Sequence, residues 1–315
     1  MVIGVDLGGM SAKAAVLCNG QIQGKVRVET SAKNPAEVTA QAIAQLCKES
    51  AEKAGISYDE VEAIGIGSPG VIDSANGTVV LWSNYSWRNV PLAALVSKYS
   101  GKKVFVTNDA NAAALGEAKY GAGKNFSDSL LITLGTGVGG GIVLGGKLFE
   151  GYRSGGAEIG HMIIRQDGEL CTCGRKGCLE CYASATALMR MTREEMKKTH
   201  DSAMWKSVTS LEQVDGITAF KAAKEGDSAA KRVISHYITA LAEGIANLVN
   251  VLRPQAVILG GGVSAEGDAL IEPLKREVYP RLYVSKEYAP LEILCADLGN
   301  DAGLYGAAQY ALEKL

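Results

Sequence analysis

The chain has 315 residues, of which 47% are hydrophobic and 21% are charged, and this composition excludes intrinsic disorder as a description of the whole chain. At about 150 residues per domain, the length indicates two domains. The formal net charge of −2 offers no basic surface for a nucleic acid partner.

Local composition disfavours two further classes of protein. The N-terminus lacks a basic segment followed by an apolar one, so we expect no secretory signal. Residues 129–146 form an uncharged stretch, but its seven glycines disfavour a membrane-spanning helix. Seven cysteines, four of them at positions 171–181, fit a cytoplasmic protein with a metal site better than a disulfide-stapled secreted one.

The first part of the chain is predicted to form strands joined by tight turns, followed by strand–helix units. Apolar residues at 2–5, 14–17 and 22–28 predict an antiparallel meander, with Asn19 and Gly20 in the second turn. Asn34 as N-cap, with Pro35 and Glu37, predicts the start of a helix that ends near residue 55. Strands are predicted at 62–66 and 103–107, and a helix after the second one extends to about residue 120.

The second part repeats this pattern. Strands are predicted at 130–134, 142–144 and 147–149, with a glycine turn at 135–141 between the first two. A long helix at 229–252, a strand at 256–259, a glycine loop at 260–262 and helices at 268–278 and 302–315 follow. We therefore predict two α/β domains, residues 1–118 and 119–315, and the closing helix is a candidate to pack on the N-terminal domain.

The glycine turns are candidate phosphate sites. Gly135, Gly137 and Gly140 match the dinucleotide fingerprint, but β-branched residues follow them where a helix would be required. The sequence also lacks the GxxxxGK[ST] pattern of P-loop enzymes. Backbone N–H groups in glycine turns form anion sites, and two such turns facing each other could hold a polyphosphate. The alternative is that these glycines serve only as tight turns that need positive φ.

A cluster of cysteines predicts a structural zinc site. Cys171, Cys173, Cys178 and Cys181 lie within one short window, with His161 ahead of them. Thiolates at this spacing, with glycines that let the loop fold back, suit tetrahedral zinc. The four ligands are either the four cysteines or His161 with three of them. The alternative is a set of buried thiols without a metal.

Several acidic residues are candidates for sugar binding or proton transfer. Asp109 follows a strand and begins a helix, where a carboxylate could also act only as an N-cap. Asp6 lies at the end of another strand, and Glu158 and Glu180 flank the cysteine cluster. Carboxylates and amides in one cleft suit a hydroxyl-rich sugar, and one carboxylate could serve as general base.

Over nearly the whole chain these segments resemble the ROK family of repressors, open reading frames and sugar kinases. Residues 6–9 and 134–141 resemble the first and second phosphate motifs of the family, and residues 108–111 resemble its catalytic segment. Residues 158–161 with 171–180 resemble its zinc signature, which is highly specific. Within the family the chain is most similar to bacterial glucokinases. The resemblance implies two actin-like, hexokinase-like (ribonuclease H-like) domains with a cleft between them.

The resemblance also implies an ATP-dependent enzyme of glycolysis and assigns roles to residues. Asp109 would be the general base that takes the proton from the 6-hydroxyl of a hexose, most simply glucose. The residues that would hold the sugar are Gly70, Asn84, Asn108, Asp109, Glu158, His161 and Glu180. The residues that would hold ATP are Asp6, Gly8, Gly9, Ser11, Lys13, Gly135, Thr136, Gly137, Gly261 and Gly262. Asp6 would hold Mg²⁺ through water. His161, Cys171, Cys173 and Cys178 would bind the structural Zn²⁺, which leaves Cys181 outside the site.

One departure from the family pattern concerns the donor site. The first phosphate motif of the family continues with Thr after its two glycines, whereas Met10 stands here, followed by Ser11. Ser11 is a candidate substitute for the missing hydroxyl, and a lost hydrogen bond to a charged group of about 1.5–3 kcal/mol would lower nucleotide affinity tenfold or more. This departure motivates a second functional hypothesis, a sugar-binding sensor with weak catalysis.

The sequence leaves the identities of the sugar and of the phosphoryl donor open. The substrate could be N-acetylmannosamine, mannose or fructose, and the donor could be polyphosphate. A sugar-responsive repressor is disfavoured, because the first phosphate motif begins at once and leaves no room for a helix-turn-helix. The family resemblance implies a homodimer in the cytoplasm, with no nucleic acid and no membrane as partner.

Overall fold

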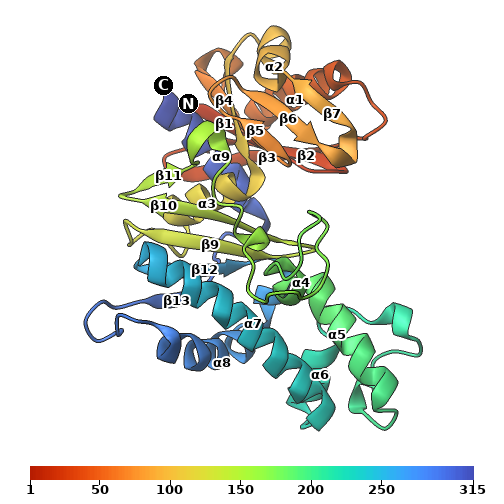
Figure 1. Cartoon of the computed structure of the whole chain (residues 1–315). Helices are drawn as coiled ribbons and strands as arrows, with labels where there is room; N and C mark the ends of the chain where they lie inside the picture. The colour runs from red at the N-terminus through yellow and green to blue at the C-terminus, as the bar shows by residue number, and fades with distance from the viewer. The chain divides into compact units, whose positions relative to one another are not determined.

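The structure is a computed structural model that describes residues 1–315, with the side chain of Ser83 left out. Contacts within the chain define two compact units (Figure 1). Met1–Leu131, Gly141–Ala157 and Asp297–Leu315 form the first unit, and Ile132–Gly140 and Glu158–Ala296 form the second. The boundary predicted near residue 118 falls inside the first unit, and the division into domains 1–118 and 119–315 stays a prediction.

The first unit is built on a five-stranded sheet with the order β3-β2-β1-β4-β8. β1 (Val2–Leu7), β2 (Ser11–Cys18) and β3 (Gln21–Glu29) form the predicted antiparallel meander. Asn19 and Gly20 both have positive φ, 50° and 78°, as the predicted tight turn requires. β4 (Ala63–Ser68) and β8 (Lys103–Asn108) continue the sheet in parallel with β1. The carboxyl ends of β1, β4 and β8 therefore meet at one edge, where ligands bind in such sheets.

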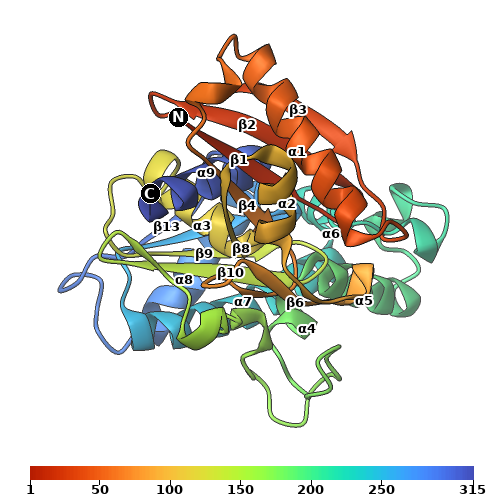
Figure 2. The ribbon, with the colours of Figure 1, turned by 90° about the horizontal axis from the view of Figure 1, so that it is seen from above.

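Helices cover both faces of this sheet. α1 (Ala36–Lys53) packs on β2 and β3, and α2 (Leu92–Ser100) packs on β8 and α1 (Figure 2). α3 (Asp109–Tyr120) and α9 (Ala302–Lys314) pack on each other, and α9 also packs on β1 and β4. The alternation of β1 explains this two-sided core, because Ile3, Val5 and Leu7 join the cluster with α1 whereas Val2 joins Ala308 and Ala311 of α9.

Close approach of α9 depends on two glycines. A Cβ on Gly65 of β4 would lie 1.8 Å from the carbonyl oxygen of Ala307, and one on Gly306 would lie 1.6 Å from that of Ala112. Both positions therefore exclude any side chain. The contacts place the predicted closing helix beside the N-terminal strands and beside the helix that begins at Asp109.

A small antiparallel sheet lies between β4 and α2 in the chain, where we predicted no strand. It has the order β5-β6-β7 and consists of β5 (Val71–Asp73), β6 (Thr78–Trp82) and β7 (Trp87–Val90). Trp82 and Tyr85 stack with ring centroids 3.8 Å apart, and Trp87 meets both edge-on. These three aromatic side chains are buried, so the short strands owe their stability to this packing.

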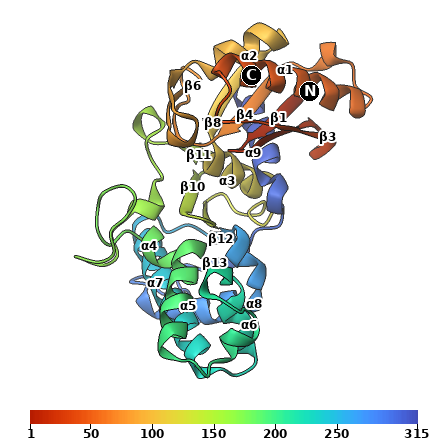
Figure 3. The ribbon, with the colours of Figure 1, turned by 90° about the vertical axis from the view of Figure 1, so that its right-hand side faces the viewer.

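The second five-stranded sheet has the order β11-β10-β9-β12-β13. Its strands are β9 (Ser129–Leu134), β10 (Val138–Leu144), β11 (Lys147–Phe149), β12 (Ala256–Gly260) and β13 (Glu292–Cys295). The helices of the second unit are α4 (Glu180–Ala183), α5 (Ala185–Lys198), α6 (Thr218–Lys224), α7 (Ser228–Leu252) and α8 (Asp268–Val278). α7 contacts α4, α5, α6 and α8, and these helices are grouped together in Figure 3.

Two local predictions are wrong. α1 begins at Ala36 with Pro35 as its N-cap, and no side chain caps it, so Asn34 does not have the predicted role. The second glycine turn ends at Gly137, because Val138–Leu144 already forms β10. Gly141 is a strand residue whose Cβ would lie 2.4 Å from that of Ala114 on α3, so close packing rather than a turn requires it.

The length and hydropathy of the helices bear on membrane insertion. Among the described residues, no helix is both long enough and apolar enough to cross a bilayer.

Candidate functional site

The first glycine turn joins β1 to β2 and is closed by a hydrogen bond of 2.8 Å from Gly8 N to Ser11 O. Neither Gly8 nor Gly9 has a positive φ, so the turn itself does not require glycine. A Cβ on Gly9 would meet no atom within 4 Å, which means that open space lies above the main chain there. Met10 is 81% exposed at the tip, and Ser11 begins β2. The main chain at the tip of the turn is therefore open to a ligand.

Asp6 and Lys13 lie across from each other on β1 and β2 at the base of this turn. The two residues are register partners, and Lys13 Nζ lies 3.3 Å from Asp6 Oδ2. Lys13 Nζ also lies 3.5 Å from the carbonyl oxygen of Asn300. The predicted donor residues Asp6, Gly8, Gly9, Ser11 and Lys13 are thus brought together by one hairpin.

Two residues that the sequence analysis missed hold this turn in place. Thr30 donates from its main chain to Met10 O at 3.0 Å and from its hydroxyl to Gly8 O at 3.4 Å. Tyr85 donates its hydroxyl to Thr30 Oγ1 at 2.8 Å. Asn84, a predicted sugar residue, precedes Tyr85 in the short 3₁₀ helix Ser83–Tyr85 and is exposed. Neither Thr30 nor Tyr85 belongs to a recognisable motif.

Asn108, not Asp109, caps α3. Asn108 Oδ1 accepts hydrogen bonds from Ala110 N at 2.9 Å and Asn111 N at 3.2 Å, and its Nδ2 donates to Gly70 O at 3.2 Å. Gly70 has φ of 97°, and a Cβ there would lie 2.3 Å from Leu81 O, so this position requires glycine. The structure therefore brings Gly70, Asn108 and Asp109 together at the carboxyl ends of β4 and β8.

Asp109 is the first residue of α3, and its Oδ1 accepts a hydrogen bond of 2.9 Å from Ala110 N. Burial raises the pKa of Asp109 above its usual value, and the negative charge of Asp6 raises it further, against the lowering effect of the Ala110 N–H. The simple N-cap interpretation is wrong for this carboxylate, because Asn108 fulfils that role. Asp109 is the only aspartate of this chain for which a raised pKa is resolved among the described residues.

In the second unit, four predicted ligands form one cluster. His161 ends the 3₁₀ helix Ile159–His161, and Cys171, Cys173 and Cys178 lie on the irregular segment 171–178, which we call the metal loop. One ligand atom from each of these residues lies within 4.8 Å of all the others. Cys181 lies on α4 and is not a member of this group. Of the two sets that the sequence left open, the geometry favours the one with His161.

The distances within the cluster fit tetrahedral zinc. Bond lengths of about 2.3 Å to sulfur and about 2.0–2.1 Å to nitrogen would separate two sulfurs by about 3.8 Å, and a sulfur from a nitrogen by about 3.5 Å. Cys173 Sγ lies 3.7 Å from Cys178 Sγ, and Cys171 Sγ lies 3.5 Å from His161 Nδ1. Two separations thus match the ideal values, and all four ligand atoms lie within 4.8 Å of one another, so the residues present fit this ion.

The pKa values of the thiols also favour a bound cation at this cluster. Burial raises the pKa of Cys171, but hydrogen bonds from Cys173, His161 and Cys178 outweigh it and lower the pKa to about 6. Burial and the neighbouring thiols raise the pKa of Cys178 to about 12. Three thiols at this spacing cannot all ionise by themselves, whereas a divalent cation would favour the thiolate at each.

Glu180 connects the metal loop to the second glycine turn, residues 135–137. Its Oε2 accepts a hydrogen bond of 3.1 Å from Val138 N, and its Oε1 accepts one of 3.4 Å from Thr172 Oγ1. A Cβ on Gly137 would lie 2.1 Å from Glu180 Oε2, so Gly137 makes room for this carboxylate. Glu158, the other predicted acidic residue, is exposed and precedes the 3₁₀ helix of His161.

The remaining predicted donor residues lie in two loops of the second unit. A Cβ on Gly135 would meet no atom within 4 Å, and Thr136 beside it is exposed. Gly261 has φ of 84°, and a Cβ there would lie 2.6 Å from Leu134 O, so it packs on the end of β9. Gly262 again faces open space. Gly261 and Gly135 thus follow neighbouring strands, β12 and β9, in one sheet.

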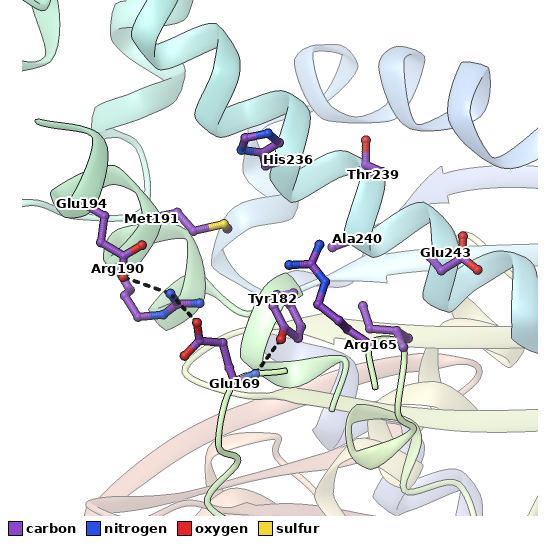
Figure 4. Close-up of a pocket in the computed structure, with 11 residues that line it drawn as sticks. Arg165, Glu169, Tyr182, Arg190, Met191, Glu194, His236, Thr239, Ala240 and Glu243 are labelled. Carbon is purple, nitrogen blue, oxygen red and sulfur yellow. Dashed lines mark hydrogen bonds and ion pairs between the residues drawn. The ribbon is translucent and has the colours of Figure 1, made fainter. Parts of the chain in front are cut away.

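A polar groove of about 460 Å³ is lined by residues 164–169, which precede the metal loop, by Tyr182 of α4, and by side chains of α5 and α7 (Figure 4). Arg190 of α5 bridges Glu169 at 3.5 Å and Glu194 at 3.0 Å, and it donates to Cys181 O at 3.0 Å. Tyr182 OH accepts a hydrogen bond of 2.6 Å from Glu169 N. These contacts attach α4 and Glu169, which precedes the metal loop, to the helical part of the unit.

The predicted site residues therefore fall into two groups, each assembled within its own unit. The first unit holds the first glycine turn with Asp6 and Lys13, and the group of Gly70, Asn108 and Asp109. The second unit holds the metal cluster with Glu158 and Glu180, and the loops with Gly135 and Gly261.

Several known proteins are similar to this chain in sequence and fold. The chain is 39% identical to a glucokinase of Thermotoga maritima over 317 residues, which cover 100% of this chain and 98% of that protein. It is 34% identical to a xylose repressor of Caldicellulosiruptor bescii over 86% of this chain and 67% of that protein. The crystal structure of a ROK family glucokinase from Streptomyces griseus, in complex with glucose and AMPPNP, matches with a TM-score of 0.82, 37% identity and 99% coverage of both chains.

These likenesses confirm the predicted fold class, an α/β protein of the actin-like, hexokinase-like type. A model of the ROK family matches residues 2–314, nearly the whole chain. The chain therefore belongs to the ROK family, as its two phosphate motifs, its catalytic segment and its zinc signature predicted.

Proposed function

We propose that the chain is an ATP-dependent kinase that phosphorylates the 6-hydroxyl of a hexose, with glucose as the substrate. The likeness to glucokinases over the whole chain supports the activity. The single observation that carries the mechanism is the state of Asp109, a carboxylate with a raised pKa that is not needed as a helix cap.

Asp109 acts as the general base. Phosphoryl transfer requires positioning and charge neutralisation more than covalent chemistry, and a carboxylate within reach of the hydroxyl takes its proton. A base works best when its pKa lies near the working pH, so the raised pKa of Asp109 makes it a better base than an ordinary aspartate. Asn108 fixes its position by capping the same helix.

The polar groups that hold the sugar are those that the family resemblance implies: Asn108, the main chain at Gly70, Asn84, Glu158, His161 and Glu180. Several carboxylate, amide and imidazole groups are typical of sites that orient a hydroxyl-rich ligand before reaction.

The nucleotide is held by the glycine turns. The open space above Gly9 and Gly262 lets a ligand approach their main-chain N–H groups. Gly135, whose N–H donates to Gly137 O at 3.0 Å, leaves room for the ligand beside the second turn. Gly8, Thr136, Gly137 and Gly261 shape these loops, and Ser11 and Lys13 contribute side chains at the first turn. Asp6 offers carboxylate oxygen, the ligand class that Mg²⁺ prefers, and the ion neutralises charge on the phosphates when bound.

His161, Cys171, Cys173 and Cys178 hold structural Zn²⁺ with the tetrahedral spacing described above. A bound ion would supply structural order, whereas His161 and Glu180, which the loop presents, bind the sugar and Asp109 takes the proton. As the family resemblance implies, we also propose that the protein is a cytoplasmic homodimer, and size-exclusion chromatography with light scattering would test the dimer.

One observation favours a second function, a sugar sensor with weak catalysis. The exposed Met10 stands where a hydroxyl would bind a phosphate oxygen at the first turn. If Ser11 does not replace that hydroxyl, the chain binds sugar but transfers phosphate slowly.

An ADP-release assay with Mg-ATP over glucose, mannose, fructose and N-acetylhexosamines tests the proposal. We expect the highest kcat/KM with glucose, and NMR of the product should show phosphate on the 6-position. Turnover with another sugar alone would replace the substrate and keep the reaction. Sugar binding without turnover would favour the sensor.

A further inference from the structure

The second glycine turn is connected to the metal loop through a single carboxylate. Glu180 accepts a hydrogen bond from Val138 N at the end of the turn, and its other oxygen accepts one from Thr172, between Cys171 and Cys173. Glu180 Oε1 also lies 3.9 Å from Cys171 Sγ. The absence of a side chain at Gly137 is what allows the carboxylate to sit against the main chain of the turn.

The His161 side of the cluster reaches the same turn by main-chain packing. Gly160 precedes His161, and a Cβ at Gly160 would lie 2.1 Å from Val138 O. Beyond α4, Ala185 N donates a hydrogen bond of 2.8 Å to Gly135 O. The turn is thus fixed at Gly135 and at Val138 by segments that begin or end at the metal cluster.

A glycine turn without such fixation would sample many conformations, and a ligand would have to order it on binding. The side-chain contact to Val138 comes from Glu180, whose own position depends on the metal loop. We propose that Glu180 is a positioning residue that holds the second glycine turn ready for nucleotide, so that loss of the metal weakens nucleotide binding even without sugar. This inference rests on the proposed function, because it takes the turn to be part of the ATP site.

Calorimetric titration of Mg-ADP in the absence of sugar tests the role of Glu180, since a residue that only contacted sugar would not affect it. We expect Glu180→Ala to raise the Kd of Mg-ADP about tenfold, as loss of a charge-assisted hydrogen bond would. Glu180→Gln keeps an oxygen that can accept from Val138 N, and its Kd should stay within about threefold. Glu158→Ala is the matched control: it removes another predicted sugar contact and should leave the Kd for Mg-ADP unchanged.

The metal is tested on the wild-type protein, stripped with a chelator and dialysed before Mg²⁺ is added. We expect a similar rise in Kd, reversed by Zn²⁺, and faster hydrogen exchange in residues 132–140 for the stripped protein and for Glu180→Ala. Unchanged Kd and unchanged exchange in both would overturn the inference while the proposed function stands. A wild-type protein with its metal that binds no Mg-ADP would overturn the inference together with the donor half of the proposed function.

Discussion

At the scale of single residues, two glycines of the same motif meet different structural requirements. Gly135 and Gly137 flank Thr136 in the second turn, and neither has a positive φ. Gly135 faces open space, whereas Gly137 lies against the carboxylate of Glu180. The first glycine therefore leaves room for a ligand, and the second leaves room for the protein itself.

This difference predicts opposite outcomes for two alanine variants. Gly135→Ala should leave the thermal midpoint unchanged or slightly higher, because alanine restricts the unfolded chain, yet it should weaken nucleotide binding. Gly137→Ala displaces the carboxylate of Glu180 from Val138 N and should lower the free energy of unfolding by about 1 kcal/mol, the contribution of that hydrogen bond. Thermal unfolding and nucleotide titration of both variants check this. Equal destabilisation by the two substitutions would contradict it.

The raised pKa of Asp109 predicts how stability depends on pH. Because the folded protein favours the protonated form, the contribution of this group to stability is greatest below the ordinary aspartate pKa of about 3.9 and is lost as pH rises through the raised folded value. Asparagine cannot ionise. Asp109→Asn should therefore be more stable relative to wild type at pH 7 than at pH 3.5, as measured by thermal unfolding at both pH values. A difference that does not change with pH would argue against a raised pKa.

At the scale of elements, irregular segments are fixed by a few polar contacts. The metal loop has no regular strand or helix between Cys171 and Cys178. Its attachments include the ligand cluster, Glu180 and a few main-chain hydrogen bonds, such as that of 2.8 Å from Gly177 N to Glu169 O. Such a segment has little apolar surface to bury, so its order depends on the ion.

Metal binding and stability should therefore follow the ligand set. Cys173→Ser should lose zinc, measured by elemental analysis, and should lower the thermal midpoint of the protein. Cys181→Ser is the matched control, because Cys181 lies outside the cluster, and it should retain one zinc per chain. Loss of zinc from Cys181→Ser, with retention in His161→Ala, would show that the four-cysteine set is correct.

A second polar fixation lies on α3. Glu117 is fully buried, and its carboxylate accepts hydrogen bonds from Ala122 N at 3.0 Å, Asp297 N at 3.1 Å and Leu298 N at 2.8 Å. It thereby ties the helix of Asp109 to the segment that leads into α9. Such contacts between residues 180 positions apart leave no local signal in the sequence.

Removal of the Glu117 carboxylate should destabilise the folded protein. Glu117→Ala removes the acceptor of three partly buried N–H groups and should lower the free energy of unfolding by about 2–3 kcal/mol. Glu52→Ala, at an exposed position of α1, should change it by less than about 0.5 kcal/mol. Urea unfolding of both variants measures the difference. Similar small effects would show that Glu117 is not a structural contact.

At the scale of the whole molecule, local signals were predictable and distant contacts were not. Asn19–Gly20 and the helix 268–278 were found because turn chemistry and periodicity act over a few residues. The sheet of β5, β6 and β7 was missed, because its strands are three to five residues long and depend on the packing of Trp82, Tyr85 and Trp87. Thr30 and Glu117 were missed because their hydrogen bonds reach residues that are distant in the sequence.

In the candidate site, too, local motifs were predictable from the sequence and the contacts between them were not. Residues in glycine, cysteine and acidic motifs were located from the sequence, and the structure adds how they are held. The cap by Asn108 and the link through Glu180 could not be predicted, because each depends on which oxygen meets which main-chain N–H group.

The central claim is that Asp109 takes the proton from the sugar hydroxyl. Turnover of Asp109→Asn with glucose and Mg-ATP, measured by ADP release beside the Kd of glucose from calorimetry, tests it most directly. We predict that kcat falls by about a thousandfold or more while the Kd of glucose changes only a few-fold, since general-base catalysis contributes about 10²–10⁴-fold. A variant that binds glucose and keeps more than about a tenth of the wild-type kcat would contradict the account.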